Sequence, residues 1–126
     1  MDKEEALKLI EIYGKAWETK DPDLIVTIFT EDATYYDPRE PENIGRDAIR
    51  EYWVTKVIGE QDNIKFTLKH LVVSEDIVMA EWHASFDDIK RDLHIELDEA
   101  AVFGVIDGKF SFLREYYRSV KTPLEK

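Results

Sequence analysis

The sequence contains no cysteine among its 126 residues. Disulfide bonds, thiolate metal sites and a cysteine nucleophile are therefore excluded. Glycine and proline are also scarce, at five and four residues, and there is no internal repeat, low-complexity tract or linker. No apolar run approaches the roughly 20 residues that a transmembrane helix needs. These absences predict one folded domain over residues 1–126, large enough to bury a core without crosslinks.

Positive charge is in short supply, with 17 basic residues against 28 acidic ones and a formal net charge of -11. A surface of this sign repels nucleic-acid phosphates and anionic lipids, so we expect neither nucleic-acid nor membrane partners. Residues 1–5 are acidic and carry no apolar stretch. We therefore expect no signal peptide and a cytoplasmic location. A hydrophobic content of 44% rules out a disordered chain.

The first half of the sequence has the spacing of helices. Apolar residues between positions 6 and 17 recur with one helical face buried. Asp21 followed by Pro22 is typical of an N-cap and first residue of a second, short helix. A short strand is predicted at 33–36, and a third helix is predicted over 49–57. Three helices are thus expected before the long strands.

The second half changes to the alternating period of strands. A two-residue Asp-Gly turn at 107–108 is a strong hairpin signal. Helices followed by a run of strands predict an α+β fold, with three N-terminal helices packed on a curved antiparallel sheet. The four predicted strands span residues 63–74, 77–88, 92–106 and 109–119.

Two ionisable residues interrupt the apolar faces of these strands. Glu99 falls among apolar residues of the third long strand, and His70 falls among those of the first. Burial would raise the pKa of Glu99 and make it a neutral proton donor. Alternatively, the strand twists Glu99 into water or pairs it with an arginine. His70 is either a core histidine with one hydrogen bond or a residue of the site.

Two further residues have both a structural and a chemical interpretation. Asp37 precedes a proline at the end of the short strand, where it is either a turn residue or an acid of the site. Tyr13 lies on the buried helix face, either as packing or as a donor to a substrate oxygen. His70, His83 and His94 divide between two strand faces, so we expect no metal site, and no motif indicates a cofactor.

Bulky side chains surround the predicted inner face, and they either line an apolar pocket for a small molecule or fill it. Glu115 is expected on the same side. The last strand carries large side chains on both faces, which favours a homodimer formed through the sheet. The predicted ligand-binding residues are Trp17, Phe29, Trp53, His70, Trp82, Phe86, Phe103 and Glu115.

Six segments of the chain together form a recognisable signature: YGKAW at 13–17, KDPD at 20–23, FTEDATYYDP at 29–38, DAIREYW at 47–53, DGK at 107–109 and REYY at 114–117. They resemble the NTF2-like superfamily and, within it, the SnoaL-like proteins. The resemblance covers nearly the whole chain and implies a cone-shaped, cystatin-like α+β fold with a hydrophobic pocket, commonly dimeric. The superfamily includes isomerases, cyclases, dehydratases, epoxide hydrolases and non-catalytic modules.

The ketosteroid isomerase branch is similar in one further respect, the separation of 24 residues between Tyr13 and Asp37. That resemblance implies that Asp37 is a base and Tyr13 an oxyanion donor, with a third, protonated acid. Depending on the alignment, the third role falls on Glu99 or on an alanine, Ala100 or Ala101.

The chain departs from its relatives in two places. Arg118 follows the REYY segment where SnoaL-like proteins often carry aspartate. The Asp-Arg-Asp set of the epoxide hydrolase branch cannot be assembled on the predicted inner face. We therefore expect an isomerase- or cyclase-like enzyme that moves protons on an apolar carbonyl compound, or else a non-catalytic binding or dimerisation module.

Overall fold

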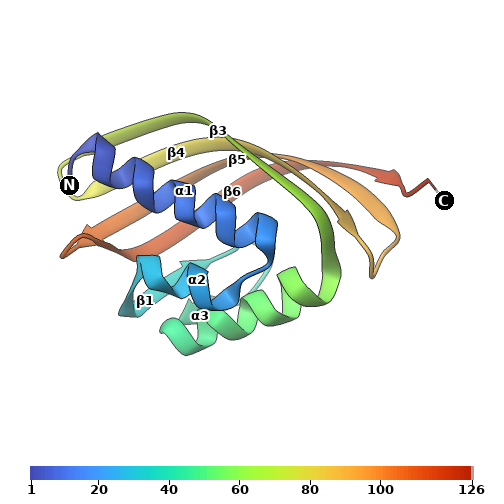
Figure 1. The fold of residues 1–126 in the computed structure, drawn as a ribbon, viewed down its shortest axis with the longest axis horizontal. Coiled ribbons are helices and arrows are strands. Elements are labelled where there is room, and N and C mark those ends of the chain that lie inside the picture. Colours follow the sequence, from blue (N-terminus) through green and yellow to red (C-terminus); the bar gives the residue numbers. More distant parts are fainter. Residues whose placement is uncertain (126) are drawn as a thin grey trace.

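A curved, open sheet of six strands arches over the helices in this computed structural model, which describes residues 1–125 (Figure 1). The strand order is β2-β1-β6-β5-β4-β3. The elements are α1 (Lys3–Thr19), α2 (Pro22–Ile25), η1 (Val26–Ile28), β1 (Phe29–Tyr36), β2 (Asn43–Ile44), α3 (Arg46–Trp53), the π-helical turn η2 (Val54–Ile58), β3 (Gln61–Ser74), β4 (Ile77–Asp88), β5 (Leu93–Ile106) and β6 (Lys109–Pro123).

Side-chain caps fix where the first two helices begin. Asp2 and Glu5 form a reciprocal capping box at the start of α1. Asp21 accepts hydrogen bonds from the backbone N–H groups of Asp23 and Leu24, with Pro22 as the first helical residue. This confirms the predicted start of the second helix. The Asp21 cap lies at the corner between α1 and α2 and sets where the chain turns from one helix into the next.

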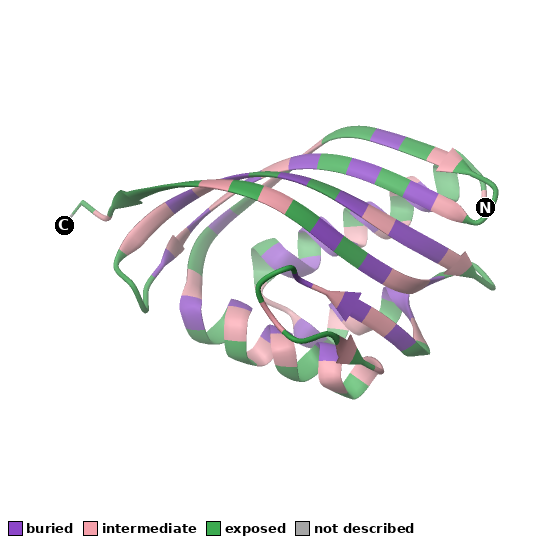
Figure 2. Cartoon of the chain, turned by 180° about the vertical axis from the view of Figure 1, so that it is seen from behind, coloured by how far each residue is buried: buried purple, intermediate pink, exposed green. Residues whose placement is uncertain are grey.

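The four long strands confirm the alternating pattern of the sequence. β3, β4 and β5 match the predicted bounds within two residues, and β6 continues four residues further, to Pro123. Asp107 and Gly108 have φ angles of 51° and 76°, as a two-residue hairpin turn with both central residues left-handed requires. Figure 2 shows buried and exposed residues alternating along these strands.

Two features of the architecture differ from expectation. A two-residue strand, β2, that was not predicted joins β1 ahead of α3, so only two of the three helices precede every strand. The sheet is also mixed, because β1 runs parallel to β6. The pairing of β1 with β6 joins segments about 80 residues apart, and no local sequence pattern encodes such a pairing. The α+β class with a curved sheet is confirmed and the purely antiparallel sheet is wrong, while the three helices precede the four long strands but not the whole sheet.

A β-bulge in β3 moves His70 to the outer face, so its predicted inward placement is wrong. The pairing with β4 shifts register between Leu68 and His70. The extra residue reverses the alternation, which leaves Leu71 buried and Val72 exposed. His70 Nδ1 instead lies 2.7 Å from an oxygen of Glu81 on the outer face. Its side chain is 77% exposed.

The core lies between the concave face of the sheet and the helices. Phe29, Trp82 and Phe103 are fully buried within it. Their rings pack against other aromatic rings, as where Phe103 lies 4.3 Å from Phe110 between centroids. Within residues 1–125, no helix combines the length and hydrophobicity needed to cross a membrane.

Glycine at position 14 is required by the close packing of α1 on β3. A Cβ at Gly14 would lie only 2.4 Å from a ring carbon of Phe66. Overpacking typically costs about 1–3 kcal/mol, more than the ~1 kcal/mol that alanine gains over glycine in a helix. We expect Gly14→Ala to lower the free energy of unfolding by about 1–2 kcal/mol in urea denaturation.

Gly59→Ala is the matched control, because its Cβ would meet nothing closer than the Val54 carbonyl oxygen at 3.5 Å. This variant should match or slightly exceed the parent in stability. Equal stability of the Gly14 and Gly59 variants would contradict the described packing of α1.

Candidate active site

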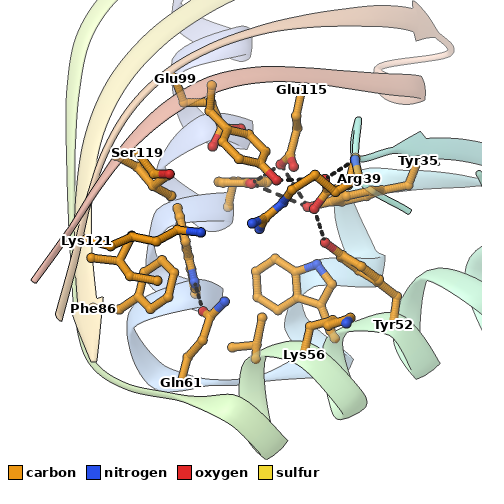
Figure 3. Close-up of a pocket in the computed structure, with 18 residues that line it drawn as sticks. Tyr35, Arg39, Tyr52, Lys56, Gln61, Phe86, Glu99, Glu115, Ser119 and Lys121 are labelled. Carbon is orange, nitrogen blue, oxygen red and sulfur yellow. Dashed lines mark hydrogen bonds between the residues drawn. The ribbon is translucent and has the colours of Figure 1, made fainter. Parts of the chain in front are cut away.

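A cavity lies under the arch of the sheet, between the strands, α1 and α3 (Figure 3). Its inner chamber has a volume of about 70 Å³. It opens into a wider, more polar vestibule of about 290 Å³. The chamber alone is smaller than the roughly 300 Å³ of typical ligand pockets; chamber and vestibule together reach it. The two share Asp37, Arg39, Tyr52, Lys56, Gln61, Phe86, Ile95 and Lys121.

Glu115 of β6 is held in the chamber by two tyrosines from different elements. Its Oε1 accepts hydrogen bonds from the hydroxyls of Tyr13 on α1, at 2.6 Å, and Tyr35 on β1, at 2.9 Å. Burial raises the pKa of Glu115 to about 7, although the Tyr13 hydrogen bond opposes that rise. The negative charge of the nearby Asp37 raises this pKa further, whereas a hydrogen bond with a second acid, Glu99, lowers it. Glu115 therefore titrates near neutrality.

Asp37 is also held by two tyrosines, at the point where β1 ends. Its Oδ2 accepts a hydrogen bond from the Tyr52 hydroxyl at 2.7 Å. Its Oδ1 accepts from the Tyr117 hydroxyl at 2.9 Å and from the backbone N–H of Arg39 at 3.0 Å. Asp37 is thus both the predicted turn residue and a lining residue of the cavity. It accepts three hydrogen bonds and donates none, as an ionised carboxylate does.

Glu99 of β5 lies between Trp82 of β4 and Tyr117 of β6, its direct cross-strand neighbours. It is 4% exposed, and it forms no ion pair among residues 1–125, so neither the solvated nor the arginine-paired alternative holds. Its Oε2 is buried with no hydrogen-bond partner in the described chain. Burial, then the charges of Glu115 and Asp37, raise the pKa of Glu99 well above its usual range. The neutral, protonated form of Glu99 is therefore favoured.

Four tyrosine hydroxyls donate hydrogen bonds to Glu115 or Asp37. Burial raises the pKa of each phenol, and the adjacent carboxylates raise it further. None is therefore a base near neutral pH. The tyrosines are Tyr13, Tyr35, Tyr52 and Tyr117.

Within residues 1–125, no group of three or more histidines or acids is arranged to bind a metal ion.

The structure brings most of the sequence-predicted residues to this cavity. Three others pack in the core beside it, since Phe29, Trp82 and Phe103 are wholly enclosed by neighbours, and His70 lies outside. The predicted residues that line the cavity are Tyr13, Trp17, Asp37, Trp53, Phe86, Glu99 and Glu115.

Several lining residues are missed by sequence reasoning. Tyr35 lies two residues before Asp37, and Tyr117 lies two residues after Glu115. Each therefore faces the same side as a predicted site residue, and strand periodicity could have found both. Arg39 lies in a loop without periodicity. Its guanidinium lies 5.0 Å from the centre of the Tyr117 ring and extends over the cavity (Figure 3). The chamber thus carries Asp37 and Arg39 beside two glutamates, and its described lining offers no second aspartate for an Asp-Arg-Asp set.

Comparison with known proteins places the chain in a family. Residues 10–112 match the SnoaL-like domain, and the chain belongs to that family. No curated protein matches it.

Solved structures share the fold. The epoxide hydrolase/cyclase-like enzyme SalBIII, described in pyran ring formation in the polyether salinomycin, is 25% identical, with TM-score 0.78 and 93% of each chain covered. A protein with a ketosteroid isomerase-like fold from Catenulispora acidiphila is 18% identical, with TM-score 0.79 and coverage of 86% of this chain and 84% of that one. An M. tuberculosis LEH-like epoxide hydrolase is 17% identical, with TM-score 0.74 and coverage of 90% and 83%. These last two likenesses concern the fold alone.

The titration of Glu115 predicts how stability depends on pH. Its pKa is higher in the folded protein, so the unfolded chain releases the proton first and stability falls as the pH rises from 4.5 to about 7. That shift corresponds to about 3 kcal/mol. Glu115→Gln should remove the loss, so its stability relative to the parent should grow by about this amount over the same range.

Urea denaturation at several pH values measures this difference. Glu11→Gln, on the exposed face of α1, is the control for loss of a carboxyl. A difference between Glu115→Gln and the parent that stays constant with pH would show that Glu115 titrates normally.

Proposed function

We propose that this protein is an acid–base enzyme, isomerase- or cyclase-like, that transfers protons on a small apolar carbonyl compound. One observation carries the proposal: Glu99, a buried acid with an unpaired oxygen, lines the same cavity as Asp37, whose two oxygens accept three hydrogen bonds. Environments that separate the protonation states of two acids in one pocket are typical of acid–base catalysis.

The roles follow from the protonation states. Asp37 takes a proton from the carbon next to the substrate carbonyl. Glu99 donates a hydrogen bond or proton to the carbonyl oxygen as negative charge develops there. Glu115 keeps Glu99 protonated through its charge, and Tyr13 holds Glu115 in place by donating to it. Tyr13 therefore acts on the substrate indirectly: it donates a hydrogen bond to Glu115, and Glu115 in turn influences the protonation of Glu99.

The same pair of groups serves a related chemistry. An acid that protonates a substrate oxygen and a base that takes a proton from a hydroxyl nucleophile are what ring formation or epoxide opening requires. The 25% identity to the epoxide hydrolase/cyclase-like SalBIII supports this wider class. The wall formed by Trp17, Phe86 and Leu97 favours an apolar substrate body.

A second candidate function is ligand binding without catalysis. The small volume of the inner chamber, about 70 Å³, favours it, as does the pairing of the Asp37 oxygens with tyrosine hydroxyls. A binder would retain affinity for small ketones in every acid variant and would show no turnover in the parent.

Substitution of the two acids tests the catalytic proposal. Asp37→Asn should slow proton abstraction by about 10²–10⁴-fold, and Glu99→Gln should slow it by roughly 10²–10³-fold. The measurement is the incorporation of solvent deuterium next to the carbonyl of small cyclic ketones and β,γ-unsaturated ketones, followed by NMR. Asp32→Asn, on the exposed part of β1, is the control and should leave exchange unchanged.

Circular dichroism and thermal unfolding establish that the variants fold. Deuterium exchange in Asp37→Asn at the parent rate would end the catalytic proposal. Binding of the ketones without exchange by the parent protein would favour the non-catalytic candidate.

We also propose a homodimer formed through the outer face of the sheet. Val72 and Met79 are cross-strand neighbours there, and both are more than half exposed, as are Tyr116 and Val120 on β6. Apolar side chains on a sheet face favour association. Analytical ultracentrifugation should give a dimer for the parent and a shift to monomer for Met79→Glu; a monomeric parent protein would contradict the proposal.

A further inference from the structure

The mouth of the cavity balances charge in a protein that is strongly acidic, because four basic and four acidic residues line its vestibule. Four of the 17 basic residues line the vestibule. Two of them are neutralised by ion pairs. Lys56 lies 2.9 Å from Glu40, and Arg91 lies 2.9 Å from Glu60. The remaining two are Arg39 and Lys121.

Arg39 and Lys121 have no acidic side chain within ion-pair distance among residues 1–125. The acids around them are already engaged: Glu40 and Glu60 in the pairs above, and Asp37 by tyrosine hydroxyls. These two cations are therefore the charged groups of the mouth that remain available to a ligand.

The two cations come from opposite walls and point into the same space. Arg39 lies in the loop after β1, and Lys121 lies near the end of β6, on the face that also carries Glu115 and Tyr117. Both line the chamber and the vestibule, and Figure 3 shows their charged ends directed toward one another across the cavity. Two like charges that converge repel each other, and an anion between them converts that repulsion into attraction.

The rest of the path is apolar. Phe86 and Ile95 line both the vestibule and the chamber, and Leu97 lines the chamber wall next to Glu99. A molecule that enters from the mouth therefore meets cations first, then hydrocarbon side chains, then the acids.

We infer that the substrates are carboxylic acids: a carboxylate bound by Arg39 and Lys121, an apolar chain along Phe86 and Ile95, and the reacting carbonyl beside Glu99. This assignment rests on the proposed acid–base function for the reacting end. Glu40, Glu60 and Asp88 share the vestibule, and their charge favours a monoanion over a dianionic phosphate.

A pair of ligands that differ only in charge tests the assignment. Hexanoate should bind the parent protein roughly tenfold more tightly than hexanamide in NMR titrations. Arg39→Gln and Lys121→Gln should each reduce that preference about three- to fivefold, as expected for exposed charges. Lys109→Gln, at the hairpin end of β6 away from the mouth, changes the net charge equally and should leave the preference intact.

Three outcomes would overturn the assignment: equal binding of hexanoate and hexanamide, an equal loss in the Lys109 control, and tighter binding of hexyl phosphate than of hexanoate. Deuterium exchange of 6-oxoheptanoate and its amide separates this claim from the proposed function. A charge preference that needs Arg39 and Lys121, without exchange in any ketone, supports the carboxylate site and ends the catalytic function. Exchange that is equally fast for acid and amide, with equal affinity, ends the carboxylate site and leaves the function standing.

Discussion

The burial of three acids around one cavity is the constraint on which the rest of the structure depends. Glu99 and Glu115 are withdrawn from water by the curved sheet, and Asp37 closes in from the end of β1. Desolvation and mutual repulsion both oppose ionisation there. Two tyrosine hydroxyls donate hydrogen bonds to each of Asp37 and Glu115, and the raised pKa of Glu99 favours its protonated form. The donors come from α1, β1, α3 and β6, so every layer of the fold contributes to the arrangement.

The burial of these acids also gives Asp37 and Glu99 different environments, and so different roles in the proposed reaction. Asp37 accepts three hydrogen bonds and is the base of the proposed reaction, while Glu99, whose buried oxygen is unpaired, is its acid. A base and an acid thus coexist in one small chamber. In the proposed carboxylate site, Arg39 and Lys121 at the mouth and the apolar walls select the molecule that these groups meet. The chain belongs to the SnoaL-like family, and its cavity lies between the curved sheet and the helices.

Much of this could be predicted from the sequence, and the failures have physical causes. Strand periodicity placed Glu99 on the inner face, and capping and turn chemistry located the start of α2 and the last hairpin. Periodicity could not reveal the bulge that turns His70 outward, because a single added residue leaves no composition signal. It also missed the parallel pairing of β1 with β6, a long-range contact. Arg39 lies in a loop, where no pattern indicates direction.

The claim at the centre of this account is that Glu99 stays protonated at neutral pH because it is buried beside Glu115 and Asp37. A pH titration of the side-chain carboxyl carbons by ¹³C NMR, with Glu99→Gln to assign the resonance, measures this most directly. The account predicts that the Glu99 carboxyl remains in its protonated form through neutral pH, while Glu115 titrates near 7. Ionisation of Glu99 in the acidic range of an exposed glutamate would contradict it.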